Sequence, residues 1–147
     1  MNTRADILVY DHDQKLQLVV EVKSKHGASA DWAAQMRRNL LVHSMIPNAP
    51  YFLLALPDFF YLWKDSENDA GAPPDYTIDT SEALASYADR PGLSLGDISH
   101  NGLERLVSSW LHDLINADLR RERAAPALHG LFDSGLYDSI KNGSVAV

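Results

Sequence analysis

The stretch that decides the fold is residues 4–23, with the sequence RADILVYDHDQKLQLVVEVK. Its two ends, residues 4–10 and 16–23, are rich in aliphatic and β-branched side chains, and the polar residues between them are typical of a turn. The pattern predicts an antiparallel β-hairpin. Because side chains alternate across a strand, Asp6, Glu21 and Lys23 are expected to converge at one edge of the sheet.

Charged side chains in so apolar a segment cost free energy unless they are paired or used. A salt bridge on a half-exposed sheet would explain Asp6, Glu21 and Lys23 without any function, and an Asp followed at a distance by Glu-x-Lys is common by chance. Here, however, the Asp opens an apolar strand, the Glu-x-Lys closes the next strand, and a helix with a polar stripe follows. This context favours a functional site.

The arrangement resembles the PD-(D/E)XK nuclease superfamily, which has the restriction-endonuclease-like fold. Within it, residues 4–63 look most like the N-terminal nuclease domain of type I restriction enzyme R subunits and like the RecB-like nucleases. The resemblance implies a nuclease that depends on Mg²⁺, with Mn²⁺ as a substitute, and DNA as the expected partner. Asp6, Glu21 and the backbone carbonyl of Val22 would bind the metal. Lys23 would position and activate water, and Gln35 on the following helix would orient water or phosphate.

Four further residues are expected to contact nucleic acid. Lys25 and His26 lie in the loop after the hairpin, where ordinary solvated charge explains them equally well, and Arg37 and Arg38 lie on the following helix. Two features depart from the family pattern. Ala5 stands where a proline is common, and no helix precedes the hairpin to supply the extra acidic residue that many members carry.

The composition is that of an ordinary globular chain. Its 147 residues, 46% hydrophobic and 22% charged, fit one domain, with a core at about 4–63 and a helical C-terminal extension at about 80–147. The absence of cysteine excludes disulfides and thiolate metal sites. Neither a signal peptide nor a membrane span is evident, so a cytoplasmic location and no membrane partner are expected.

The net charge of −7 argues against wholesale binding to nucleic acid. Residues 1–43 nevertheless hold six Lys and Arg against five Asp and Glu, whereas residues 44–147 hold seven against fifteen. A surface for nucleic acid should therefore be confined to the hairpin and the helix after it.

The rest of the chain predicts an α/β fold whose mixed sheet has about four to five strands flanked by helices. Hydrophobic periodicity and turn residues place strands at 51–56 and 59–63, a surface insertion at 64–76, helices at 31–45, 80–88, 101–119 and 136–141, and an edge strand at 145–147. Ala33, Met36 and Leu40 are expected to form the apolar face of the first helix. The long helix, or a second copy of the chain in a homodimer, should cover the open face of the hairpin.

Three functional hypotheses follow from these observations. The first is a metal-dependent nuclease, the second is an inactive relative that serves as a nucleic-acid or protein binding module, and the third is an unrelated α+β protein with a chance motif. Zinc peptidase, P-loop NTPase and α/β-hydrolase motifs are all missing. On the long helix, Trp110 is expected in the core, and His112 has no partner at the spacing of metal ligands.

Overall fold

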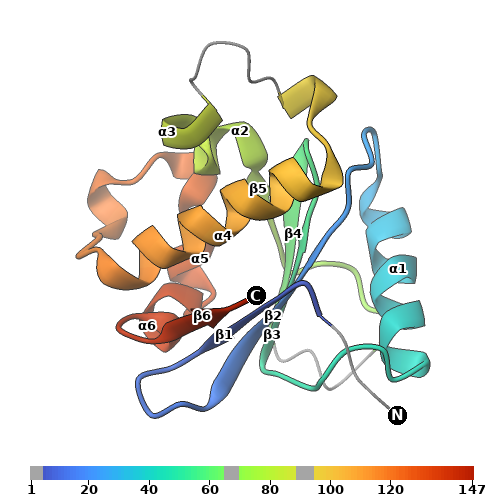
Figure 1. Cartoon of the computed structure of the whole chain (residues 1–147), viewed down its shortest axis with the longest axis horizontal. Coiled ribbons are helices and arrows are strands. Elements are labelled where there is room, and N and C mark those ends of the chain that lie inside the picture. Colours follow the sequence, from blue (N-terminus) through green and yellow to red (C-terminus); the bar gives the residue numbers. More distant parts are fainter. Residues whose placement is uncertain (1–4, 65–69, 89–94) are drawn as a thin grey trace.

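The structure is a computed structural model that describes residues 5–64, 70–88 and 95–147. A mixed sheet lies between helices on both of its faces (Figure 1). The α/β class predicted from the sequence is confirmed. The sheet, however, has six strands, in the order β5-β4-β3-β2-β1-β6, where four to five were expected.

The first two strands form the predicted hairpin. β1 (Ile7–Tyr10) pairs antiparallel with β2 (Leu16–Val22), and Ile7 lies opposite Val20. In the turn, a side-chain oxygen of Asp11 accepts hydrogen bonds from the backbone N–H groups of Asp13 and Lys15, each at 2.9 Å. The turn therefore fixes the register that brings the two strands' charged ends together.

A helix then carries the chain across one face of the sheet. α1 (Ala30–Val42) connects β2 to β3 (Tyr51–Ala55), and these two strands are parallel. β4 (Phe59–Lys64) returns antiparallel to β3, as expected. β5 (Tyr76–Asp79), at the sheet edge, was not predicted, because its four residues lie between the stretch assigned to a surface insertion, which ends at Tyr76, and the helix predicted from Thr80.

The first helix differs from its prediction in length and in register. It begins after Ser29, whose hydroxyl accepts a hydrogen bond from the backbone N–H of Trp32 at 3.1 Å, and it ends at Val42 rather than near Met45. Its fully buried residues are Ala33, Arg37 and Leu40. An arginine thus occupies the stripe where the apolar periodicity placed Met36, which is only half-buried.

The second half of the chain contains short helical segments, one long helix and a final strand. In order they are α2 (Thr80–Ala83), α3 (Ala85–Ala88), the 3₁₀ turn η1 (Leu95–Asp97), α4 (His100–Asn116), the 3₁₀ turns η2 (Arg121–Arg123) and η3 (Pro126–Leu128), α5 (Gly130–Asp133), α6 (Leu136–Ile140) and β6 (Ser144–Ala146). β6 pairs antiparallel with β1, so that Val145 lies opposite Val9. The C-terminal part therefore completes the sheet that the hairpin begins.

The sheet separates two hydrophobic clusters. On one face, Val19 and Phe52 pack with Ala33 and Leu40 of α1. On the other face, the larger cluster includes apolar side chains of the hairpin together with the apolar stripe of α4. The prediction that the long helix covers the open face of the hairpin is confirmed, and Figure 1 shows α4 and α1 on opposite sides of the strands.

Candidate metal centre

Two carboxyl groups meet where the hairpin strands end. Asp6 lies one residue before β1, and the pairing of Ile7 with Val20 puts it beside Glu21 of β2. The backbone N–H of Val22 donates a hydrogen bond of 2.8 Å to Oδ2 of Asp6, which fixes this carboxylate against β2. Asp6 and Glu21 therefore lie together, as side-chain alternation predicts.

The carboxyl group of Glu21 is buried and lies next to the negative charge of Asp6, and both disfavour its ionised form. Only 6% of Glu21 is exposed. Burial raises the pKa of Glu21 to about 8, and the neighbouring charge of Asp6 and a hydrogen bond between the two side chains act in the same direction. Near neutral pH the pair therefore favours one shared proton over two negative charges, unless a cation is present.

Lys23 follows directly after the last residue of β2 and lies two residues after Glu21. Its side chain is half-buried, and its backbone N–H donates to the carbonyl oxygen of Ala55 at 3.1 Å. The positive charge of Lys23 lowers the pKa of Glu21, but less strongly than burial and the charge of Asp6 raise it. The lysine is thus near enough to interact electrostatically with the carboxyl pair without neutralising it.

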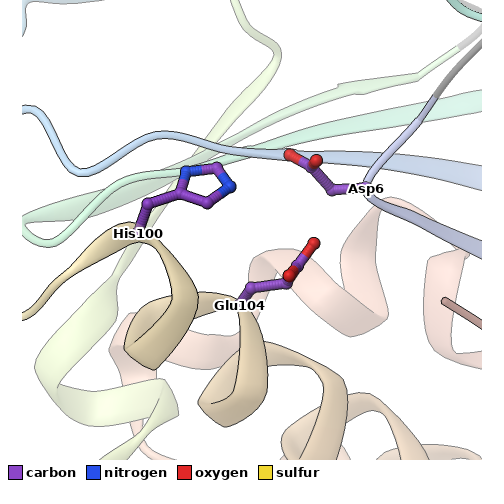
Figure 2. A group of neighbouring side chains, drawn as sticks. All are labelled: Asp6, His100 and Glu104. Atoms are coloured by element: carbon purple, nitrogen blue, oxygen red, sulfur yellow. The ribbon is translucent and has the colours of Figure 1, made fainter.

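The first turns of α4 (His100–Asn116) place two more possible metal ligands beside Asp6. The side chains of His100 and Glu104 point toward Asp6, and one possible ligand atom from each of the three residues lies within 4.8 Å of the other two (Figure 2). All three residues are half-buried. Ser99 caps this helix, since its hydroxyl accepts a hydrogen bond of 3.0 Å from the N–H of Gly102. Asp6 therefore lies between Glu21 of the sheet and the two residues of α4.

This set of donors fits a divalent cation. Carboxylate oxygens suit Mg²⁺ and Mn²⁺, while an imidazole nitrogen suits transition metals better than Mg²⁺. A cation near Asp6 would also offset the repulsion between the carboxylates of Asp6 and Glu21, which favours the protonated form of Glu21. The ligands that the structure offers are Asp6, Glu104 and His100, with Glu21 next to Asp6.

His100 and Glu104 were missed in the sequence. The signal was present, because a His and a Glu four residues apart at the start of an amphipathic helix lie on one face of that helix. Only His112 was considered on this helix, and it is exposed. What the spacing alone could not reveal is that α4 packs over the hairpin with this end beside Asp6.

Two predicted site residues on α1 lie elsewhere. Gln35 is exposed and lines a shallow surface depression with Asp31 and Arg38, and it makes no hydrogen bond to Asp6, Glu21 or Lys23 in the described parts of the chain. Arg37, predicted to contact nucleic acid, is buried. It is 1% exposed, its guanidinium lies over the ring of Trp63 at 5.4 Å, and one of its nitrogens donates to the carbonyl oxygen of Ala70 at 3.3 Å.

The remaining predicted contact residues are at the surface. Lys25 is exposed, and its ammonium group lies 5.3 Å from the ring centroid of Trp32. His26 is also exposed and lies 3.6 Å from a carboxylate oxygen of Asp58. Arg38 is exposed in the depression next to Gln35.

Comparisons with protein-family models, with curated proteins and with solved structures give no match to this chain. Across residues 5–64, 70–88 and 95–147, every helix is too short or too polar to cross a bilayer.

Proposed function

We propose that this protein is a metal-dependent nuclease of the PD-(D/E)XK type, acting on DNA. The observation that carries the proposal is the position of Asp6. Its carboxylate lies beside buried Glu21, and one of its oxygens lies within 4.8 Å of possible ligand atoms of His100 and Glu104. The order of hairpin, helix and parallel strand in residues 7–55 also agrees with what the resemblance implies. Glu104 of α4 offers a further acidic residue beside Asp6.

Each residue has a role in this proposal. Asp6, Glu21, Glu104 and His100 would hold the metal, with the carbonyl of Val22 as a further ligand, and the Val22 N–H keeps Asp6 in place. When bound there, Mg²⁺ or Mn²⁺ would supply positive charge to offset that of the phosphate and would lower the pKa of a coordinated water. Lys23 orients the attacking water and stabilises the negative charge that develops on the phosphate oxygens.

Contacts with the nucleic-acid backbone are assigned to Lys25, His26 and Arg38, which are exposed. Such contacts to phosphate position a substrate without reading its sequence. Since Arg37 is buried and the chain carries a net charge of −7, this surface is small. We therefore expect weak binding that decreases steeply as salt is raised.

The direct test is cleavage of plasmid and single-stranded DNA with Mg²⁺ or Mn²⁺. Wild type should cleave in the presence of metal, whereas Glu21→Ala, Glu104→Gln and Lys23→Met should lose nearly all activity. Glu122→Gln is the matched control, because Glu122 is exposed in η2, outside this site. Cleavage by Glu104→Gln at the wild-type rate would remove α4 from the site, and undiminished cleavage by Glu21→Ala would refute the proposal.

Metal binding can be tested without knowing the substrate. A ligand that binds only the folded state raises the free energy of unfolding, by about 2.7 kcal/mol at a hundredfold excess over its Kd. Mn²⁺ should therefore raise the melting temperature of wild type and of Lys23→Met, which removes a nearby positive charge but no ligand. The rise should be absent in Glu21→Gln and much smaller in His100→Gln. Equal rises in wild type and Glu21→Gln would place the metal elsewhere.

A second candidate is an inactive relative that binds nucleic acid or protein. The exposed position of Gln35 outside the cluster and the burial of Arg37 favour it, because both reduce the expected catalytic and binding set. It predicts the Mn²⁺-dependent rise in melting temperature with no cleavage of any DNA or RNA tested.

A further inference from the structure

A hollow lies toward the C-terminal end of α4, away from His100 and Glu104 at its N-terminal end. It has a volume of about 640 Å³, within the range of typical small-molecule sites. Its apolar walls come from Trp110 and Leu114 of α4 and from Leu128, Leu131 and Phe132 in the segment that follows. The size and the lining are those of a site that can take up a compact apolar group.

Two arginines give this hollow a positive rim. Arg120 and Arg123 both line it, and both are exposed. Arg121, between them, is engaged elsewhere, since its Nε donates to Asp133 at 2.6 Å. In the described residues, by contrast, neither Arg120 nor Arg123 forms an ion pair. Two guanidinium groups are therefore available to a ligand in an otherwise acidic protein.

One acidic residue also lines the hollow. Asp118 is exposed, and one of its carboxylate oxygens lies 3.4 Å from the ammonium nitrogen of Lys141. That lysine offsets the charge of Asp118. The two arginines are thus left as the net charge at the rim, and their flat, fork-shaped donor groups match a carboxylate in geometry.

We infer that this hollow binds a small amphipathic carboxylate, with its apolar body against Trp110 and Phe132 and its carboxylate on Arg120 and Arg123. The body can be an aliphatic chain or an aromatic ring, since both bury apolar surface against these walls. The inference does not depend on the proposed nuclease activity. Trp110, the lining residue nearest to Glu104, lies about 9 Å along the helix from it, at 1.5 Å per residue. None of Asp6, His100 and Glu104 lines the hollow, so the two sites are separate.

The experiment is isothermal titration calorimetry of the full chain with four probes: octanoate, 1-octanol, 1-naphthoate and 1-naphthalenemethanol. Each carboxylate is paired with a neutral alcohol of similar shape, and the aliphatic and aromatic pairs distinguish the two kinds of body. At least one carboxylate should bind at a single saturable site, about tenfold more tightly than its alcohol, because the charge-assisted hydrogen bonds are lost in the alcohol.

The variants test where the carboxylate binds. Arg120→Gln with Arg123→Gln should weaken carboxylate binding about tenfold and leave alcohol binding unchanged. Arg105→Gln is the matched control, since Arg105 is an exposed arginine of α4 that does not line this hollow, and it should have no effect. Ala125→Phe fills the hollow from its wall and should abolish binding of all four probes, with an unchanged melting temperature showing that the chain is folded.

Several results would overturn the inference. They are the absence of saturable binding by either carboxylate, equal affinity for carboxylate and alcohol, and equal losses in Arg105→Gln and the double arginine variant. Undiminished binding by folded Ala125→Phe would place the ligand elsewhere and would overturn it as well. The Mn²⁺ response described above should be the same with and without the carboxylate, so failure here and failure of the proposed metal site can be told apart.

Discussion

Glu21 is the residue of the candidate metal centre whose surroundings are least favourable for a charge. It is a buried carboxylic acid near the end of β2, between Val20 and Val22 and opposite Leu54 of the parallel strand β3. A buried carboxylate without a cation is costly, so the folded protein favours the protonated form. Glu21 therefore contributes a dependence of the free energy of unfolding on pH, in the range between its ordinary pKa and its raised one.

The first prediction is that wild type loses stability as pH rises. The pKa of Glu21 is about 8 in the folded chain against 4.5 when unperturbed, so its protonated form stabilises the fold fully below pH 4.5, and this contribution is lost as pH rises toward 8. Each pH unit in this window removes up to about 1.4 kcal/mol. Glu21→Gln, which carries no charge at any pH, should match wild type at low pH and melt at a higher temperature at pH 9. Thermal melts across this range with chelator present measure the difference, and parallel curves for the two proteins would contradict it.

The site residues of the hairpin could be predicted from the sequence, whereas those of α4 could not. Alternation along two paired strands is a local rule, so Asp6, Glu21 and Lys23 could be placed together without tertiary information. His100 and Glu104 reach Asp6 only because α4 packs across the hairpin, which no local rule encodes. Arg37 shows the opposite error, because a charged residue on a helix was assigned to the surface, while packing against Trp63 buries it.

Among the elements, β6 depends on an unusually close backbone approach. Gly143 immediately precedes β6, and a Cβ atom at this position would lie 1.8 Å from the carbonyl oxygen of Tyr10 and 2.9 Å from that of Ile140. Both obstacles are backbone atoms, which cannot rotate away. Glycine is therefore required where the chain leaves α6 and joins β1.

The second prediction follows from this contact. Gly143→Ala should push β6 away from β1 and lower the free energy of unfolding by about 1–3 kcal/mol, the usual cost of overpacking. Ser144→Ala, at the next and exposed position, is the control and should change stability little. Urea unfolding followed by circular dichroism measures both variants. A Gly143→Ala protein as stable as wild type would mean that β6 does not lie against β1 as described.

Elements were predictable from the sequence where their periodicity was long or uninterrupted. The hairpin, α1, β3, β4 and α4 all had such patterns, and their ends differ from expectation by only a few residues. β5 was missed because four residues after a proline pair carry too little pattern to separate a strand from a loop. Its pairing with β4 comes from tertiary structure, since Ile78 fills the core beside Phe60.

On the scale of the whole molecule, the candidate metal centre brings together residues from the two halves of the chain. Asp6 and Glu21 come from the first hairpin, whereas His100 and Glu104 come from a helix that begins some eighty residues after Glu21, at His100. β6 reinforces this arrangement, because it follows α4 and then pairs with β1. The C-terminal half thus covers one face of the hairpin with α4, extends its sheet with β6 and places Glu104 beside Asp6.

The last prediction is that a metal ion couples these distant segments. If Mn²⁺ binds Asp6 together with His100 and Glu104, it must restrain the start of β1 and the first turns of α4 at the same time, because each ligand holds its own backbone. Hydrogen exchange followed by mass spectrometry should then show slower exchange with Mn²⁺ in residues 5–10 and in residues 99–106, two regions far apart in sequence. Glu104→Gln should reduce the protection in both regions together, whereas Glu122→Gln should preserve it. Protection confined to residues 11–13, whose two aspartates could bind Mn²⁺ weakly by themselves, would mean that the metal binds at the turn and that α4 has no part in holding it.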